Sequence, residues 1–345
     1  MSAPAFWQRR GWPACLLLPL GGLFWLFAGL RRLAYRRGWL PAHQVGVPVV
    51  VVGNLGAGGA GKTPLVMRLV DDLRQTGHVP GVISRGYGGH VRGTQLVDAE
   101  SDPAAVGDEP VLIARVAACP VAVGRDRVAA ARLLRSQHPA VDVILSDDGL
   151  QHYALARDIE IVVVNGEAGF GNAWPLPAGP LREPLARLKR ADAVVLMQRP
   201  GVPPPRLEHP RVFAVAPRAG RIYSLVRPGA SLEAAGQTRN IVAVAGIARP
   251  QQFFRTLEGL GFILAEQRAF PDHHVFRAAD LAAGLPVVMT EKDAVKCRPY
   301  ARPGWYALEW RVEENADLRT WLAQELAALL PSQPARTGAG ASLAS

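Results

Sequence analysis

The residues from Gly56 to Thr63 have the types and spacing of a loop that binds phosphate. They read GAGGAGKT, which fits the pattern G-x-x-x-x-G-K-[ST]. In such a loop backbone N–H groups surround a phosphate chain, Lys62 reaches the β- and γ-phosphates and the Thr63 hydroxyl binds Mg²⁺. The residues expected to contact a nucleotide are therefore Gly56, Ala57, Gly58, Gly59, Ala60, Gly61, Lys62 and Thr63.

A second nucleotide signal is the run VDVILSDDG, in which Asp147 and Asp148 end an apolar segment. In proteins with this type of loop, an acid at the end of a neighbouring strand holds Mg²⁺ or its water. The pattern predicts that one of the two binds the metal and leaves open which one. Together the two motifs predict a protein that binds a nucleoside triphosphate with Mg²⁺.

A phosphate acceptor other than water requires a base, and several loops offer candidates. Asp108 and Glu109 begin a predicted helix, where an acid can also act only as a cap. The segment FPDHHVF offers two histidines beside an acid, either as an acid–base pair, as structural histidines or, least favoured without further Cys or His nearby, as a metal site. Further polar residues in loops are Arg85, Tyr87, Arg125, Arg127, Arg182, Glu183, Asp272, His273, His274, Lys292 and Asp293.

Short apolar runs alternate with helical segments, which is typical of a parallel sheet covered by helices on both faces. Predicted strands cover 47–53, 79–87, 120–124, 141–149, 159–166 and 191–197. The proline-rich stretch 199–210 predicts a boundary, after which 211–217 and 221–226 are expected to form a hairpin between two lobes. We predict an α/β fold of the P-loop NTPase type with four parts: an anchor and basic flank (1–44), the P-loop core (45–205), a smaller α/β domain (206–330) and a disordered tail (331–345).

The N-terminus carries an apolar run over 14–30 without a charge, preceded by Arg9 and Arg10 and followed by four arginines within 31–37. A signal peptide and a buried core helix are the alternatives, but the arginines after the run favour a membrane anchor with the rest of the chain in the cytoplasm. Whether the run spans or lies in the bilayer stays open. Three scattered cysteines argue against disulfides and zinc sites. The net charge of +10 favours anionic partners, without the basic helix or stacking platform expected for nucleic acid.

Seven motifs in order resemble the lipid A tetraacyldisaccharide 4′-kinase family: GNLGAGGAGKTP, SRGYGG, GDEP, DDGLQH, FGNAWPLPAGPLREPL, FPDHH and TEKDAVK. The resemblance implies transfer of the ATP γ-phosphate to the 4′-hydroxyl of an acylated glucosamine disaccharide 1-phosphate lipid at the cytoplasmic face of the bacterial inner membrane. It implies contact with inner-membrane phospholipid, with no obligate protein partner evident.

The same resemblance implies roles for individual residues. Asp108 is expected to act as the base, with His273 as its partner, His274 as the less favoured choice, and Lys62 at the transferring phosphoryl group. Thr63, Asp147, Asp148 and Glu183 are the expected metal-binding residues. Two positions depart from the family pattern: Ala60 replaces a threonine of the loop, and Ala173 replaces a glycine in a turn that favours positive φ.

Two other functions are compatible with the motifs. A membrane-anchored ATPase that drives assembly or transport of a partner would use the same loop, although Ala57 stands where such ATPases carry a lysine. A nucleotide-binding module without catalysis is the other, against which Lys62 and the two adjacent acids argue.

Overall fold

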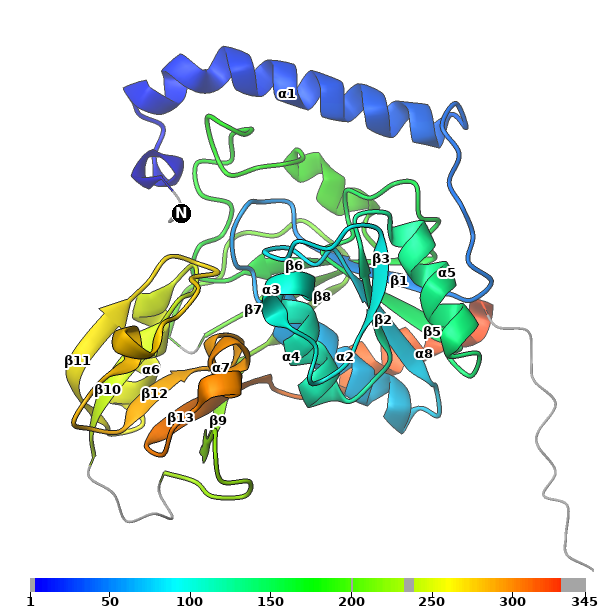
Figure 1. The fold of residues 1–345 in the computed structure, drawn as a ribbon. Coiled ribbons are helices and arrows are strands. Elements are labelled where there is room, and N and C mark those ends of the chain that lie inside the picture. The colour runs from blue at the N-terminus through cyan, green and yellow to red at the C-terminus, as the bar shows by residue number, and fades with distance from the viewer. Residues whose placement is uncertain (1–3, 200, 233–238, 330–345) are drawn as a thin grey trace, which may run out of the picture.

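A computed structural model describes residues 4–199, 201–232 and 239–329, and places them in two lobes with one long helix across the end of the larger lobe (Figure 1). The predicted tail 331–345 lies outside the described residues. The larger lobe holds an eight-stranded sheet with the order β3-β4-β2-β5-β1-β6-β7-β8. Its strands are β1 (Val49–Gly53), β2 (Pro80–Ser84), β3 (Thr94–Val97), β4 (Val121–Gly124), β5 (Val143–Asp147), β6 (Ile159–Asn165), β7 (Ala193–Met197) and β8 (Val212–Val215).

Neighbouring strands of this sheet are parallel except β3, which runs antiparallel to β4. Side chains of β1 alternate between two apolar clusters, because Val50 and Val52 face one side of the sheet and Val49 and Val51 the other. Helices α2 (Lys62–Gln75), α4 (Asp108–Ala117) and α8 (Ala316–Leu329) contribute to the first cluster, while α5 (Arg127–Gln137) and η2 (Leu185–Arg190) contribute to the second. The predicted sheet with both faces covered is therefore confirmed.

The smaller lobe contains a five-stranded sheet with the order β11-β10-β12-β13-β9. Its strands are β9 (Pro217–Ser224), β10 (Asn240–Ala245), β11 (Ile263–Ala269), β12 (Val287–Thr290) and β13 (Trp305–Val312), with only β9 antiparallel to its neighbour. Its helical segments are α6 (Pro250–Gly259), η3 (Ala278–Leu281), α7 (Glu291–Cys297) and η4 (Arg298–Tyr300). Helix α7 lies on the side of this lobe that faces α4 (Figure 1).

The division between the lobes differs from the predicted boundary at 205/206. Strand β8 pairs with β7 in the larger sheet and β9 pairs with β13 in the smaller one, so the expected hairpin is absent among the described residues and each strand joins a different lobe. The C-terminal helix α8 returns to the larger lobe, where Leu318 and Trp321 enter its core. The chain therefore crosses between the lobes twice, because the apolar faces of β8 and α8 complete the larger core.

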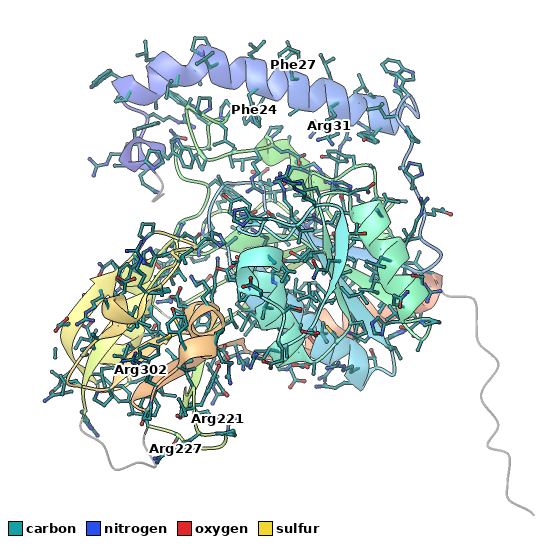
Figure 2. The ribbon with its side chains drawn as sticks, in the orientation of Figure 1. Phe24, Phe27, Arg31, Arg221, Arg227 and Arg302 are labelled. Carbon is teal, nitrogen blue, oxygen red and sulfur yellow. The ribbon has the colours of Figure 1, made fainter. Side chains whose placement is uncertain are left out.

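The N-terminal region forms a short turn, η1 (Ala5–Gln8), and the helix α1 (Trp12–Arg36). Of the helices described here, α1 is the one long and apolar enough to cross a membrane. Only Ala14 and Gly21 of α1 are buried, and Phe27 on its outer side is 62% exposed (Figure 2). Both ends of α1 contact the larger lobe: at its start Arg10 Nε donates to the Asn172 carbonyl (3.1 Å), and near its end Arg32 pairs with Glu183 (3.3 Å).

Candidate active site

The loop between β1 and α2 has the geometry that its sequence predicts. Gly58 and Gly61 have φ of 117° and 86°, which side chains other than glycine rarely adopt, and Gly61 caps the start of α2. A Cβ atom at Gly61 would also lie 2.6 Å from Met197 Cε of β7, the end of a flexible side chain, so the positive φ is the stronger reason for glycine there. Lys62 Nζ lies 3.1 Å from Asn54 Oδ1 and 3.3 Å from Asp148 Oδ1, which orients this lysine over the loop.

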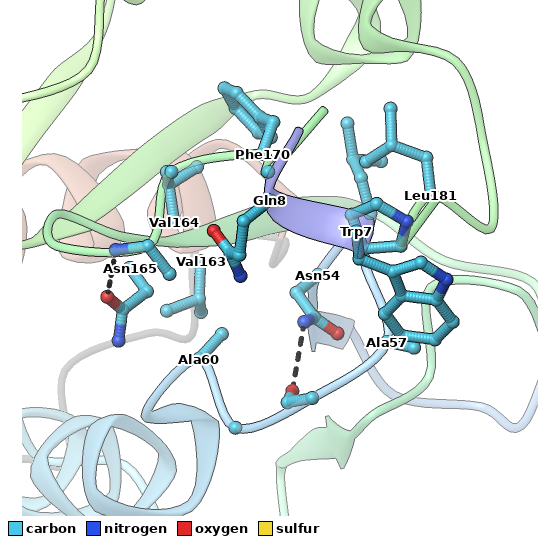
Figure 3. A pocket seen from close by; sticks show the side chains of 18 of the residues that line it. Trp7, Gln8, Asn54, Ala57, Ala60, Val163, Val164, Asn165, Phe170 and Leu181 are labelled. Carbon is cyan, nitrogen blue, oxygen red and sulfur yellow. Dashed lines mark hydrogen bonds between the residues drawn. The ribbon is translucent and has the colours of Figure 1, made fainter. Parts of the chain in front are cut away.

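A pocket borders this loop and draws its walls from three distant parts of the chain (Figure 3). Loop residues face the end of β6, η1 closes one side, and Arg249 joins from the smaller lobe by donating to Asn165 Oδ1 at 3.2 Å. The contributions of η1, Asn54 and Arg249 were missed at the sequence level, although Asn54 stands directly before the glycine-rich loop. The labelled lining residues are Trp7, Gln8, Asn54, Ala57, Ala60, Val163, Val164, Asn165, Phe170 and Leu181.

Asp147 and Asp148 follow one another at the end of β5, but their environments differ. Neither carboxylate oxygen of the buried Asp147 has a hydrogen-bond partner among the described residues. Burial and the charges of Glu109 and Asp148 raise the pKa of Asp147 to about 7, against the opposing effect of Lys62 and Arg127. Asp148 has a left-handed backbone (φ 49°), and although burial opposes its ionisation, Lys62 and Arg182 lower its pKa to about 2.

The donor set fits Mg²⁺. A buried carboxylate with free oxygens is costly unless a cation or donor occupies it, and hard divalent cations prefer oxygen ligands. Asp147 offers such oxygens, whereas the oxygens of Asp148 are shared with Lys62 and Arg182. Asp147 is therefore the better candidate of the adjacent pair for direct contact with the metal.

Glu183, the fourth predicted metal-binding residue, is buried with donors around both oxygens. Its Oε2 accepts from Tyr153 Oη (2.7 Å) and Arg32 Nη1 (3.3 Å), and its Oε1 accepts from Gln151 Nε2 (3.0 Å). The same Gln151 Nε2 also donates to the Asn54 carbonyl (3.2 Å) at the start of the loop. These contacts connect α1 to the nucleotide loop and leave Glu183 less available to a metal than Asp147.

The structure brings Asp108 and His273 together across the two lobes. Asp108 begins α4 of the larger lobe, and its Oδ2 lies 3.0 Å from Nδ1 of His273, which follows β11 of the smaller lobe. Burial opposes ionisation of Asp108, but the hydrogen bond with His273 and the charges of Lys292 and Lys296 outweigh it and lower its pKa below the usual range. Asp108 is thus an ionised carboxylate in contact with an imidazole.

His273 is distinguished from its neighbour His274 by what each ring contacts. His273 has a left-handed backbone (φ 61°), and its ring meets Tyr87 edge-on with centroids 5.0 Å apart. His274 stacks on Phe270 at 4.5 Å and pairs with Asp280 at 3.2 Å, within the smaller lobe. His273 is therefore the histidine of the pair that faces the predicted base, a choice that the sequence left open.

Asp108, Glu109 and His273 are close enough together to consider a metal there, since one ligand atom from each lies within 4.8 Å of the others. However, Lys292 Nζ lies 2.9 Å from Glu109 Oε1 and 3.9 Å from Asp108 Oδ1. An ammonium group already neutralises these carboxylates, so the arrangement favours proton transfer over metal binding.

Comparison with known proteins agrees with this arrangement. The sequence model of the family described as LpxK, tetraacyldisaccharide-1-P 4′-kinase, matches residues 13–327. A protein of Thiobacillus denitrificans named tetraacyldisaccharide 4′-kinase is 50% identical over 328 residues, 94% of this chain and 99% of that relative. A protein of the same name from Aeromonas hydrophila is 49% identical over 94% of this chain and 95% of its own length.

A solved structure is also similar to this chain. The crystal structure of an "apo" form of LpxK from Aquifex aeolicus in complex with ATP superimposes with a TM-score of 0.77 at 29% identity, over 91% of this chain and 99% of that chain. The family model, which matches residues 13–327, covers both lobes and α1 from its second residue onward. On the family match and the curated relatives, the chain belongs to the tetraacyldisaccharide-1-P 4′-kinase (LpxK) family.

Proposed function

We propose that this protein transfers the γ-phosphoryl group of ATP to the 4′-hydroxyl of a tetraacyldisaccharide 1-phosphate, a step of lipid A biosynthesis. The observation that supports the proposal is the Asp108–His273 contact between the two lobes, because a carboxylate beside an imidazole is suited to act as a base. Glu109, the next residue, raises the pKa of Asp147 at the end of β5 through its charge, so the start of α4 and the end of β5 are close enough to interact electrostatically. A base of this kind serves a hydroxyl acceptor, whereas simple nucleotide binding has no use for it.

Each residue then has a defined task. Asp108 accepts the proton of the 4′-hydroxyl as that oxygen attacks the γ-phosphorus, and His273 holds the carboxylate through Nδ1. Lys62 and the backbone N–H groups of the glycine-rich loop neutralise the phosphate oxygens as the bond to ADP breaks. Thr63 and Asp147 would hold Mg²⁺, which would supply positive charge to the phosphates of ATP.

Arginines below α1 suit the 1-phosphate of such an acceptor. Burial and the charges of Arg127, Arg157 and Arg31 lower the pKa of His152 to about 4, against the effect of Asp126. Arg31 belongs to α1 and Arg127 to the start of α5, so positive potential gathers between the helix and the lobe. We infer that an anionic headgroup enters there, with its acyl chains along the exposed side of α1.

We further propose that α1 lies in the plane of the cytoplasmic face of the bacterial inner membrane, among its phospholipids, and does not cross it. A helix of 25 residues is about 37 Å long. Because Arg10 and Arg32, near its two ends, both contact the same lobe, the helix runs along that lobe (Figure 1). Its exposed apolar stripe, Leu16, Leu20, Leu23, Phe27 and Leu30, then enters one leaflet.

The activity is tested with detergent-solubilised protein, γ-labelled ATP and Mg²⁺, with and without the tetraacyl disaccharide 1-phosphate. We expect label in the lipid, little free phosphate, and a ~10²–10⁴-fold lower rate for Asp108→Asn. Asp98→Asn, an exposed carboxylate of the same lobe, is the matched control and should retain full activity. Free phosphate alone, regardless of lipid and of the Asp108 variant, would contradict the kinase and favour an ATPase.

The position of α1 is tested through Cys15, which is exposed while Cys119 and Cys297 are buried. A fluorophore on Cys15 is reconstituted into vesicles with the catalytic lobes outside, and a lipid quencher is confined to one leaflet at a time. Quenching only from the outer leaflet supports a helix in the plane of the membrane. Quenching only from the inner leaflet would show that the helix crosses.

A further inference from the structure

Lys292 occupies the centre of the contact between the two lobes. It lies on α7 of the smaller lobe, and its Nζ is 2.9 Å from Glu109 Oε1 and 3.9 Å from Asp108 Oδ1 of the larger lobe. Within its own lobe the same atom is 3.1 Å from Asp272 Oδ1 and 3.5 Å from His273 Nε2. A single ammonium group thus contacts four polar side chains, two from each lobe, including both members of the proposed base pair.

The composition of the chain gives an independent reason to single out this residue. Only four of its 39 Lys and Arg residues are lysines, namely Lys62, Lys189, Lys292 and Lys296. Three of these four lie at the candidate active site, while the other cationic positions of the chain, apart from Lys189, carry arginine. Since a chain that uses arginine almost everywhere retains lysine here, the compact ammonium group is what these positions require.

Packing around Lys292 explains that requirement. Its side chain is 15% exposed, and its four partners surround one nitrogen atom. The compact ammonium group of lysine suits this arrangement better than the planar guanidinium group of arginine. Helix α7 is itself fixed, because Asp293 accepts from the Gly246 N–H (2.8 Å) and from Thr290 Oγ1 (2.7 Å). The ammonium group is therefore presented from a rigid support.

Lys296, one turn further along α7, has a different set of contacts. Its Nζ pairs with Asp293 of its own lobe at 2.7 Å and lies 5.0 Å from the Phe276 ring. Its distance to Asp108 Oδ2 is 3.8 Å, without a contact to Glu109 among those described. Only Lys292 among these lysines holds carboxylates of both lobes at hydrogen-bond distance.

We propose that Lys292 is a positioning residue of the phosphoryl-transfer reaction: it joins Glu109 and Asp108 to Asp272 and His273, and so completes the base when the lobes meet. The inference rests on the proposed kinase function, whose base it serves. It assigns to the smaller lobe a cation that orients Asp108 and keeps it ionised, in addition to supplying the histidine.

The charges that face Asp108 define the expected pH dependence. His273 and Asp272 come from the loop after β11, Lys292, Lys296 and Asp293 from α7, and Glu109 from α4 itself. Removing the Lys292 charge disfavours the ionised carboxylate, and the pKa of Asp108 rises. Since the base must be ionised to act, the acid limb of the rate profile moves to higher pH.

The test compares Lys292→Met and Lys292→Arg with Lys189→Met, which removes the one lysine outside the site. We measure kcat, KM for Mg·ATP and the pH profile of kcat/KM on the lipid acceptor. For Lys292→Met we expect a ~10–100-fold lower kcat, little change in KM for Mg·ATP, and an acid limb moved upward by about one pH unit. For Lys292→Arg we expect the acid limb to remain at the wild-type pH, because the positive charge is kept. We expect kcat to be lower than that of wild type, because the planar guanidinium group does not fit among the four partners.

Other results would overturn the proposal. A Lys292→Met enzyme within threefold of wild type would do so, and so would a loss of the same size at every pH, which is what a merely structural role predicts. If the methionine variant is insoluble, Lys292→Gln takes its place: an acid limb at the wild-type pH rejects the proposal, and an acid limb moved to higher pH supports it. A wild-type enzyme that leaves the lipid unlabelled would instead contradict the proposed function.

Discussion

Asp147 and Asp148 are adjacent in the chain, yet the structure gives their carboxylates opposite surroundings. Lys62 and Arg182 pair with Asp148, while Asp147 is buried without a partner among the described residues. A buried acid whose pKa is raised in the folded state lowers stability above its unfolded pKa, and this cost grows as the pH rises from about 4 to 7. The unpartnered Asp147 thus lowers the stability of the metal-free protein and keeps its carboxylate oxygens free to bind a metal.

Asp147→Asn should therefore stabilise the metal-free protein and impair the enzyme. In EDTA at pH 8 we expect the free energy of unfolding to rise by about 1–3 kcal/mol, because an unpaired buried charge is removed, with a smaller gain at pH 5. The Mg²⁺ concentration for half-maximal activity should increase more than for Asp148→Asn. Thermal unfolding and metal titration check this, and a less stable Asp147→Asn protein at pH 8 would contradict it.

Ala173 also has its backbone in a region that residues other than glycine rarely adopt. Its φ of 60° belongs to the left-handed region, as expected from the turn in which the family pattern has glycine. Ala173→Gly should relieve this strain and stabilise the protein by about 0.5–1 kcal/mol after the greater entropy of glycine in the unfolded chain is subtracted. Ala156→Gly, in a loop without positive φ, is the control and should show no gain on denaturant unfolding.

At the scale of elements, sequence pattern predicted the strands and helices around the nucleotide loop because each is a continuous apolar run beside a turn. β1, β5 and β6 lie within the predicted ranges. β3 was not predicted, since TQLV is only four residues long and half-exposed. The assignment of β8 and α8 to the larger lobe could not be predicted, because it depends on which sheet edge and core they complete.

The contact between α1 and the loop at 172–183 is an element-level feature that only the structure reveals. A Cβ atom at Gly21 would lie 2.7 Å from Pro175 Cγ, while the neighbouring Gly22 has open space around it. The same loop supports the nucleotide site, since the Pro180 carbonyl accepts from the Ala57 N–H at 2.7 Å. The position of α1 is thereby connected to the phosphate-binding loop.

This contact gives a matched pair of variants. Gly21→Val should push α1 from the loop and increase KM for Mg·ATP, by ~3–10-fold if the phosphate-binding loop shifts by a fraction of an ångström. Gly22→Val makes the same change of residue in the same helix but meets no neighbour, so its KM should equal that of wild type. Equal effects of both variants would show that helix propensity, and not the contact, determines the result.

For the whole molecule, a role could be predicted for those residues that belong to a motif with one known function. Lys62 and Thr63 are examples, because their motif is typical of phosphate binding. Residues that act across the lobes were not, because their partners are 165 positions apart in the Asp108–His273 contact and 183 in the Glu109–Lys292 contact. Spacing along the chain carries no information on such pairs. The resemblance to a family identified Asp108 and His273, and the folded arrangement distinguished His273 from His274.

The apolar stripe of α1 and the exposed arginines of the smaller lobe lie at different ends of the molecule. Variants at the two ends can therefore distinguish membrane binding through α1 from binding through net charge. The apolar stripe of α1 lies at one end, while Arg227 and Arg302 lie on the smaller lobe far from it (Figure 2). If the chain bound membranes through its overall charge of +10, any loss of two positive charges would weaken binding alike. If α1 enters the leaflet, only changes on α1 should weaken binding to membranes strongly.

Leu20→Asp with Phe27→Asp lowers the net charge by the same amount as Arg227→Gln with Arg302→Gln. We expect the first pair to weaken binding to vesicles containing anionic lipid by at least ~100-fold, since two apolar side chains are lost from the leaflet and two charges would have to enter it. The second pair should bind within twofold of wild type. Vesicle flotation at 0.15 M salt measures both, and ADP binding in detergent confirms that each variant is folded. Equal loss in both pairs would show that net charge, rather than α1, is responsible for binding to the vesicles.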